Sequence, residues 1–254
     1  MTQHLSIPLW ITKDEQITCP ALLDQYQLLL SDEERAQYQR FRYDEHRHQF
    51  LVTRALVKST LSRYCPEIAP HQWLFKKNRF GKPAIVNRLN TPLYFNLSHT
   101  KGAVVLVVHG EGEVGVDIEW IHRREKIIDI AARYFTQHEK NTLTAMDPIT
   151  QHHHFYQLWT LKEAYIKACG QGMSLPLNQF YFQFLKQRIH VCHTEPSAPV
   201  SENYQFLQFQ LGTEYQGALA IQCTTRDFSS PTLQFRHVVP LRAEQRDTHR
   251  EFSR

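Results

Sequence analysis

The sequence predicts an α+β protein built from helix-rich stretches that are followed by strand-rich ones. Apolar residues recur at helical spacing in 31–64 and again in 155–170. In 93–120 and 180–239, short runs of β-branched and aromatic residues are separated by turn residues instead. Each half of the chain therefore runs from helices to strands, which hints at two similar α+β lobes.

Composition narrows the class of protein. The 254 residues are 42% hydrophobic, enough to bury a core in one large domain or two ordinary ones. The longest apolar run, 103–108, is far shorter than the roughly 20 residues that span a bilayer, and residues 1–16 lack the pattern of a signal peptide. We therefore expect a cytoplasmic protein with no membrane partner.

Cysteine usage and charge exclude further classes. The five cysteines are odd in number and scattered without a CxxC pair, so we expect neither a disulfide framework nor a zinc site. The net charge of +4 lacks the clustering of a nucleic-acid surface, and we expect no nucleic-acid partner. A mild positive charge suits an acidic partner or an anionic substrate.

In the first half, 7–11 is a candidate strand and 19–30 an amphipathic helix. Ser31 and Glu34 have the spacing of a capping box, so we expect a long helical stretch over 33–64. After Pro66 and Pro70 the pattern changes to strands and turns. Four cationic residues then lie within seven positions, beside a Gly and a Pro. This stretch is either a phosphate-binding edge or a turn that keeps the surface soluble. The four cationic residues are Lys76, Lys77, Arg79 and Lys82.

Strands are expected at 93–100, 103–108 and 114–120. In the last of these, period-two geometry places Asp117 and Glu119 together on one face. Two adjacent carboxylates repel each other, so this face either reaches open water or holds a cation. Hard oxygen ligands of this kind suit magnesium.

A helix is expected at 127–135. A second helix should begin after Thr136, which has Glu139 three residues on as in a capping box, and should end at Pro148. A third should run from Phe155 to a cap at Gly170. Glu163 and Lys167 lie one turn apart, as a surface pair or as part of a site. Lys162 falls inside the apolar stripe, where a lysine needs a partner or a cleft. Strands follow at 180–184, 188–192, 204–211, 217–223 and 233–239.

One arrangement accounts for the acids and the cations together. A magnesium ion held by Asp117 and Glu119, with Glu163 as a further candidate ligand, would bind a pyrophosphate, while cationic and imidazole side chains neutralise its remaining charge. These side chains are Lys82, His99 and Lys167. A GxxxxGK[ST] loop is absent. Gly110, Gly112 and Gly115 have the spacing GxGxxG, but this stretch is expected to join two strands rather than to open a helix, so the common nucleotide folds are not indicated.

Three blocks in this order resemble the large, Sfp-type 4′-phosphopantetheinyl transferases: Phe95-Asn96-Leu97-Ser98-His99, Gly115-Val116-Asp117-Ile118-Glu119, and 159–167. Gly81-Lys82-Pro83 upstream and 170–177 downstream extend the resemblance, which covers roughly 31–184. It implies two pseudo-symmetric α+β lobes with coenzyme A bound between them. We place the lobes at 1–114 and 115–240, followed by a polar tail at 241–254.

The resemblance also implies a magnesium-dependent reaction. The phosphopantetheine arm of coenzyme A moves to a serine of an apo acyl or peptidyl carrier protein, and adenosine 3′,5′-bisphosphate leaves. Asp117, Glu119 and Glu163 match the metal-binding acids, and Lys167 matches a phosphate contact. Lys82 and His99 match coenzyme-binding positions of the family, with Ser98 beside them. Glu163 or Glu139 would take the serine proton directly or through water.

The match departs from the family near the coenzyme's 3′-phosphate. Where many relatives carry basic residues, this chain has Glu34 and Gln37. The candidate substitutes are Arg35, Arg40, Arg47 and Lys77. The carrier is expected to be acidic; it could serve fatty-acid, polyketide or nonribosomal-peptide synthesis. Two lobes in one chain favour a monomer.

Two other functions would use the same residues. A magnesium-dependent phosphodiesterase would cleave a pyrophosphate without a carrier. A non-catalytic module would bind an acidic partner, although it would not need Asp117 and Glu119 on one strand face.

Overall fold

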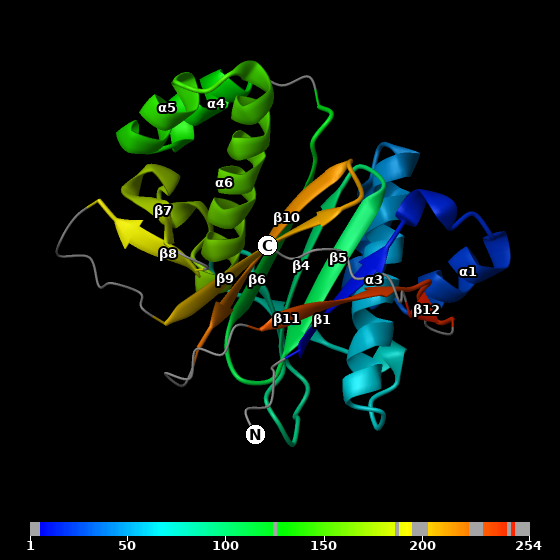
Figure 1. Ribbon diagram of the computed structural model, residues 1–254. Coiled ribbons are helices and arrows are strands. Elements are labelled where there is room, and N and C mark those ends of the chain that lie inside the picture. The colour runs from blue at the N-terminus through cyan, green and yellow to red at the C-terminus, as the bar shows by residue number, and fades with distance from the viewer. Residues whose placement is uncertain are drawn as a thin grey trace.

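The computed structural model describes residues 6–123, 126–185, 188–194, 203–223, 231–242 and 245–246. In this part of the chain, the main elements form four layers in the order helix, sheet, sheet, helix (Figure 1). The predicted α+β fold class is confirmed. The α-helices are α1 (Pro20–Leu28), α2 (Asp32–Arg40), α3 (Asp44–Tyr64), α4 (Ile127–Tyr134), α5 (Gln137–Thr144) and α6 (Pro148–Cys169).

The strands are β1 (Ser6–Thr12), β2 (Phe75–Lys77), β3 (Pro83–Ile85), β4 (Tyr94–Thr100), β5 (Ala103–His109), β6 (Val114–Trp120), β7 (Phe180–Leu185), β8 (Arg188–His193), β9 (Tyr204–Leu211), β10 (Tyr215–Gln222), β11 (Thr232–His237) and β12 (Gln245–Arg246). Short 3₁₀ helices are η1 (Asp14–Gln16), η2 (Pro70–Gln72), η3 (Gly172–Ser174) and η4 (Leu177–Gln179).

The first main sheet has the strand order β12-β11-β1-β5-β4. β1 pairs antiparallel with β5 and parallel with β11, so a strand near the start of the chain lies beside one near its end. β11 lies within the expected second lobe, 115–240, but it joins the sheet of β1, which lies in the expected first lobe. The lobe boundaries at 114 and 240, and the pseudo-symmetry of the lobes, stay predictions.

β5 is buried on both faces, which explains its unbroken apolar sequence. Val105 and Val107 pack into a core that the first sheet shares with the second, whereas Val104 and Leu106 pack with Leu56 of α3. Figure 1 shows α3 and α1 on one side of the paired sheets and α6 on the other.

The second main sheet, β6-β10-β9, is antiparallel and places the candidate acids. Val116 and Ile118 of β6 face the first sheet. By alternation, Gly115, Asp117 and Glu119 face α6. The sheet therefore turns its charged face toward the helix that carries the Glu-Lys motif.

The stretch 33–64 forms two helices, where a single long one was expected. α2 ends at Arg40, and Phe41 is extended (φ −66°, ψ 125°) before α3 begins. The predicted capping box of Ser31 and Glu34 is confirmed. Glu34 also forms ion pairs with Arg54 and with Lys58, the latter at 2.7 Å, and these pairs join α2 to α3.

Pro148 begins α6, whereas the sequence suggested that it closes the preceding helix. Asp147 Oδ1 accepts hydrogen bonds from the amides of the first turn, and proline is favoured there because its missing amide would have no partner. Gly170 ends α6 in the left-handed conformation (φ 65°), as predicted. Of the tail 241–254, Gln245–Arg246 form β12 against β11, and residues 243–244 and 247–254 lie outside the described residues.

Every helix in the described ranges is too short or too polar to cross a lipid bilayer.

Candidate functional site

β4 and β6 are the facing edges of the two main sheets, and in the described chain no backbone ladder joins them. Side chains of β4 reach the edge of β6 instead. Asn96 Oδ1 accepts a hydrogen bond from the Val116 amide at 2.9 Å, and Thr100 Oγ1 accepts one from the Trp120 amide at 3.1 Å. We call this line of contacts between β4 and β6 the seam.

Asp117 lies in the middle of the seam and is 3% exposed. Its Oδ1 accepts from Ser98 Oγ of β4 at 2.9 Å and from Lys167 Nζ of α6 at 2.7 Å. Lys167 Nζ also donates to Ser98 Oγ at 3.0 Å and to the Val116 carbonyl at 3.3 Å. Three residues that the sequence placed in the site, from three separate elements, therefore meet at one point.

Gly115 allows α6 to approach β6 closely enough for these contacts. A Cβ at this position would lie 2.1 Å from the carbonyl oxygen of Ala164 and 2.3 Å from the amide nitrogen of Ala168. No other residue fits without moving the helix. Because Lys167 lies between these two alanines, the position of its ammonium depends on the glycine.

Two further carboxyl groups surround this point. Burial and the charge of Asp117 raise the pKa of Glu119 to about 7, against the lowering effect of Arg123 and Lys167. Burial and Asp117 also raise the pKa of Glu163, which Lys167 lowers. Arg123 Nη1 lies 3.3 Å from Glu119 Oε2.

Within the described residues, no three His, Cys, Asp or Glu side chains are grouped closely enough to form a ready-made metal centre. Lys167 and Arg123 neutralise Asp117 and Glu119 instead. Two observations fit a cation. Asp117 Oδ2 is buried without a hydrogen-bond partner among the described groups. Besides the effect of burial, the charge of Asp117 raises the pKa of both glutamates, so the three carboxyl groups lie within electrostatic reach of one another.

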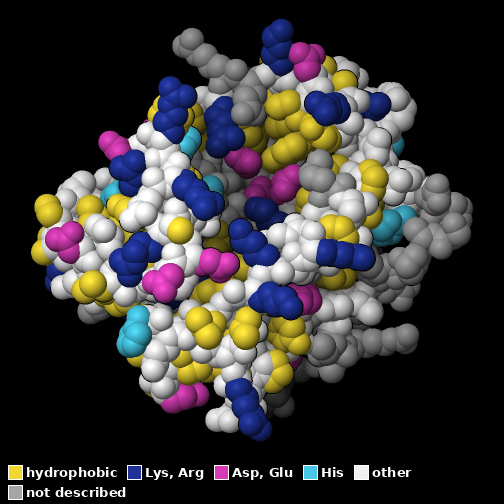
Figure 2. Space-filling view, turned by 180° about the vertical axis from the view of Figure 1, so that it is seen from behind, with side chains coloured by type: hydrophobic (Ala, Val, Ile, Leu, Met, Phe, Trp, Pro, Cys, Tyr) yellow, Lys and Arg dark blue, Asp and Glu magenta, His cyan; other side chains and the backbone are white. Residues whose placement is uncertain are grey.

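The carboxylates Asp117, Glu119 and Glu163 thus remain candidate magnesium ligands. Figure 2 shows acidic side chains near a hollow in the middle of one face, with Lys and Arg side chains on several sides of it. Such a mixture of charges suits a cation that is bound together with an anionic ligand.

His99 follows Ser98 on β4 and is exposed. The surrounding protein atoms and the charge of Lys167 lower the pKa of His99 below 6.5, while Asp117 opposes this effect. His99 therefore lies within electrostatic reach of the cluster, and its role in coenzyme binding stays a prediction.

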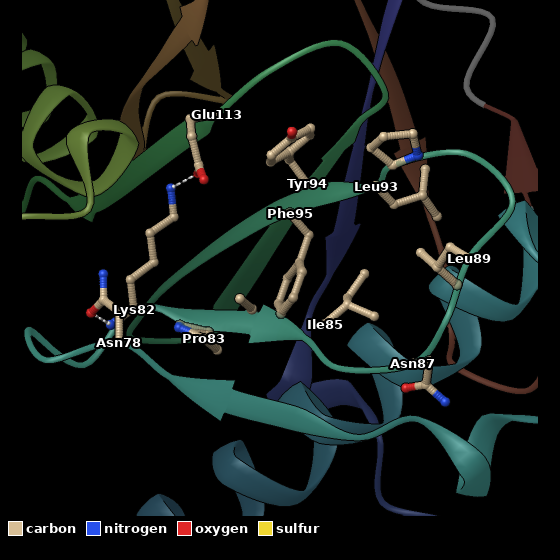
Figure 3. A pocket seen from close by; sticks show the side chains of 12 residues that line it. Asn78, Lys82, Pro83, Ile85, Asn87, Leu89, Leu93, Tyr94, Phe95 and Glu113 are labelled. Atoms are coloured by element: carbon tan, nitrogen blue, oxygen red, sulfur yellow. Dashed lines mark hydrogen bonds and ion pairs between the residues drawn. The ribbon is translucent and has the colours of Figure 1, made fainter.

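Lys82 lies at one end of the seam, against the last turn of α6. Its Nζ donates to Glu113 Oε2 at 2.5 Å, to the Ala168 carbonyl at 3.1 Å and to the Val114 carbonyl at 3.2 Å. Figure 3 shows the side chain reaching across to Glu113. The ammonium caps a helix terminus whose carbonyls lack intrahelical partners. In this structure its charge is thus committed to protein groups.

Asn78 adds a second contact to the same helix end. Its Nδ2 donates to the Gly170 carbonyl at 2.8 Å, and its Oδ1 accepts from the amides of Phe80 and Lys82 at 2.9 and 3.0 Å. The turn between β2 and β3 therefore holds the C-terminus of α6, one turn beyond Lys167.

A pocket of about 380 Å³ lies beside this turn (Figure 3). Ile85, Leu93 and Phe95 contribute to its apolar lining, and Lys82 and Glu113 contribute charged groups. Lys77 on β2 is exposed, and its side chain takes part in no hydrogen bond or ion pair with the described residues. Its role in coenzyme binding stays a prediction.

Glu139, the other candidate base, lies in a buried ion pair. Its side chain is 3% exposed, and its Oε2 accepts from Thr136 Oγ1 at 2.9 Å and lies 3.0 Å from Lys162 Nζ. Lys162 Nζ also donates to the carbonyls of Leu177 and Phe180. Glu139 is thus the partner that a lysine inside an apolar stripe requires, and Glu163 remains the candidate base.

Sequence reasoning missed several residues of the seam. The alternation of Asn96, Ser98 and Thr100 was a usable signal, since it places three small polar side chains on one face of a strand. Arg123 carried no such signal. Nothing in the linear sequence shows that the chain after β6 turns back toward Glu119.

Two family models match this chain. The model of the 4′-phosphopantetheinyl transferase superfamily matches residues 113–235, and that of the N-terminal part of 4′-phosphopantetheinyl transferases matches residues 19–111. Together they cover both sides of the seam.

Known proteins with similar sequences carry the same name. The chain is 33% identical over 157 residues to the 4′-phosphopantetheinyl transferase Sfp of Bacillus subtilis, covering 62% of this chain and 67% of Sfp. It is 32% identical over 146 residues to the 4′-phosphopantetheinyl transferase HetI of Nostoc sp., covering 57% of this chain and 61% of HetI. The match thus spans less than two thirds of the length of HetI.

A solved structure of a holo-(acyl-carrier-protein) synthase from Bacillus anthracis in complex with CoA (3′,5′-ADP) is 19% identical, with a TM-score of 0.36. The match covers 44% of this chain and 96% of that one. On the sequence matches, the chain belongs to the 4′-phosphopantetheinyl transferase superfamily. The family expected from the sequence is confirmed.

Proposed function

We propose that this chain transfers 4′-phosphopantetheine from coenzyme A to a serine hydroxyl of an apo acyl or peptidyl carrier protein. The meeting of Ser98, Asp117 and Lys167 at the seam carries the proposal, because it joins an ammonium and a partly unsatisfied buried carboxylate in a chain of this superfamily. Sfp and HetI are named for the same transfer.

In the proposed reaction, the serine oxygen forms a bond to the phosphorus that carries pantetheine. The bond from that phosphorus to the bridging oxygen breaks, and adenosine 3′,5′-bisphosphate leaves with the electron pair. Glu163 is the proposed acceptor of the serine proton, directly or through water.

Lys167 would neutralise charge on the diphosphate from the position in which Asp117 and Ser98 hold it. Asp117, Glu119 and Glu163 would hold magnesium, which when bound supplies positive charge at the phosphate oxygens. Lys82, Ser98 and His99 are the proposed coenzyme contacts, with Lys77 toward the 3′-phosphate.

The proposal extends to the setting of the reaction. A chain with a net charge of +4 suits an acidic carrier. We expect a cytoplasmic monomer that serves a carrier of fatty-acid, polyketide or nonribosomal-peptide synthesis.

The test is the intact mass of several apo carrier proteins after incubation with the chain, coenzyme A and magnesium. We expect one carrier or more to gain a single phosphopantetheine, and the gain to disappear with a chelator or in Lys167→Ala. Cleavage of coenzyme A without a modified carrier would contradict the proposal and favour the phosphodiesterase.

A further inference from the structure

We propose that Trp159 is a positioning residue, which holds the carboxylate of Glu119 in place for a divalent cation by donating a hydrogen bond from its indole nitrogen. The inference rests on the proposed function, because it needs a cation at the candidate ligands Asp117 and Glu119. It gives a role to a side chain that is neither a candidate ligand nor a candidate phosphate contact.

Trp159 lies on the edge of α6 that carries two candidate site residues. Between Leu158 and Ala168, only Trp159, Glu163 and Lys167 are partly exposed, and every other residue is buried. These three residues follow one another at a spacing of four, so they lie along one side of the helix. Trp159 is therefore in line with the candidate base and the candidate phosphate contact.

This edge of α6 runs antiparallel to the charged face of β6. Lys167 contacts Asp117, and eight residues earlier in the helix the Trp159 side chain forms a hydrogen bond with Glu119. An indole nitrogen can only donate, so the carboxylate of Glu119 is the acceptor. Burial and the charge of Asp117 raise the pKa of Glu119, whereas this hydrogen bond is among the contacts that lower it.

Other aromatic side chains fix the ring of Trp159. It stacks on Phe155 of the preceding turn, with ring centroids 5.9 Å apart, and on Phe135 at the end of α4, with centroids 6.4 Å apart. The ring of Tyr134 meets it edge on at 5.8 Å. Because Phe135 and Phe155 are each 1% exposed, the indole packs on a buried base that determines where its nitrogen points.

A neutral donor suits a carboxylate that is to bind a cation. A carboxylate has two oxygens and about four acceptor sites, so one hydrogen bond from an indole leaves room for a cation on the same group. The indole brings no positive charge that would repel the cation, unlike an ammonium or a guanidinium. Hydrogen-bond partners of metal-binding carboxylates orient the ligand in this way.

The test uses the whole chain, with Mn²⁺ alone as the probe and its binding measured by electron paramagnetic resonance. Trp159→Phe keeps an aromatic ring and removes the indole donor. Benzothienylalanine incorporated at position 159 keeps the two-ring shape and has sulfur in place of the N–H group, so it separates the hydrogen bond from the packing. Circular dichroism confirms that each variant is folded.

Trp73→Phe is the matched control. It also removes an indole hydrogen bond, which Trp73 Nε1 donates to Ser62 Oγ at 2.9 Å, but it does so in the core between α3 and the first main sheet. A general effect of replacing a packed tryptophan by phenylalanine appears in this variant as well. Its Mn²⁺ binding should match that of the unsubstituted chain.

We expect both variants at position 159 to bind Mn²⁺ about tenfold more weakly than the unsubstituted chain, as for residues that orient metal ligands. In a Glu119→Ala chain, Trp159→Phe should change the Mn²⁺ affinity by less than about twofold, because its effect passes through Glu119. Unchanged Mn²⁺ binding with benzothienylalanine, or an undiminished loss in the Glu119→Ala chain, would overturn the inference.

The same titration separates this failure from failure of the proposed function. If the unsubstituted chain binds no Mn²⁺, or if Asp117→Asn binds it equally well, the cation site and the role of Trp159 are both overturned. Intact masses of the carrier then show whether phosphopantetheine transfer survives. If Mn²⁺ binds and only the variants at position 159 leave its affinity unchanged, the role of Trp159 alone is overturned.

Discussion

Two glutamates on neighbouring helices, Glu139 and Glu163, show how the surroundings of a residue decide its role. Glu139 is buried against Lys162 and Thr136, and burial lowers the pKa of Lys162 to about 8 although Glu139 raises it. Glu163 is half-buried near Asp117 and Lys167. We therefore expect Glu139 to stabilise the core and Glu163 to take part in the proposed chemistry.

Glu139→Gln should therefore lower stability and spare turnover. It leaves the buried ammonium of Lys162 without its charged partner, at a cost of about 3 kcal/mol. Glu163→Gln should do the reverse, with the melting temperature nearly unchanged and turnover reduced by about a hundredfold or more. Thermal unfolding, with carrier modification measured well below the transition, distinguishes the two.

The double variant Glu139→Leu/Lys162→Met is the control for this pair. Replacing both charges by apolar groups removes the unpaired ion and should recover most of the lost stability. A loss of turnover in folded Glu139→Gln equal to that in Glu163→Gln would restore Glu139 as a candidate base.

At the scale of elements, the packing of α6 on β6 assembles the site. The helix lies over the strand at Gly115, and its C-terminus is held by Lys82 and Asn78 from the β2–β3 turn. Since Asp117 is on the strand and Lys167 on the helix, the separation of these elements determines whether the two side chains meet.

Gly115→Ala should displace α6 and impair both stability and activity. The added methyl would overlap backbone atoms of the helix, which are not free to rotate away, so we expect a loss of about 3 kcal/mol. Turnover in the folded fraction should fall by about tenfold or more because small displacements at a reacting centre are costly. Chemical denaturation and carrier modification measure the two effects.

Gly110→Ala is the matched control. It lies in the β5–β6 turn with no atom within 4 Å of an added Cβ, so it should change neither property. Normal stability and turnover in Gly115→Ala would show that β6 and α6 can separate without disturbing the site.

Local patterns predicted most elements, whereas contacts between distant segments stayed hidden. The capping boxes at Ser31 and Thr136 and the glycine cap at Gly170 were readable because the groups involved lie within a few residues. The break at Phe41 was missed, since no proline or glycine marks it. Pro148 was assigned to the wrong end because the same residue follows one helix and begins the next.

For the whole molecule, the parallel pairing of β1 with β11 ties the end of the chain to its beginning. Phe235 of β11 packs into the core between the sheets, the Thr12 hydroxyl donates to the Val238 carbonyl, and Tyr26 donates to the Pro240 carbonyl. These contacts make the segment 231–242 part of the first main sheet and of its packing.

A chain that stops after Cys223 should therefore fail to fold stably. It loses several buried apolar side chains, each worth about 1.5–3 kcal/mol, against a total stability of roughly 5–15 kcal/mol. A chain that stops after Arg242 keeps these contacts and should melt within a few degrees of the full chain. Equal melting temperatures for both truncations would contradict this view of β11.

At this scale, the candidate site was predictable only in part. The blocks around Ser98, Asp117 and Lys167 named residues that do meet. Two ion pairs depend on how the two sheets face each other, which no local pattern encodes. They are Lys82 with Glu113 and Arg123 with Glu119.

The seam has a consequence for amide hydrogen exchange. Amides inside a β-ladder exchange with solvent only when strands separate, but those of Val116 and Trp120 are protected by Asn96 and Thr100 of the opposing sheet. Their exchange rates therefore report separation of β4 from β6, even while every ladder stays intact. Two backbone protons beside the candidate site thus act as built-in probes of how often the two main sheets separate along the seam.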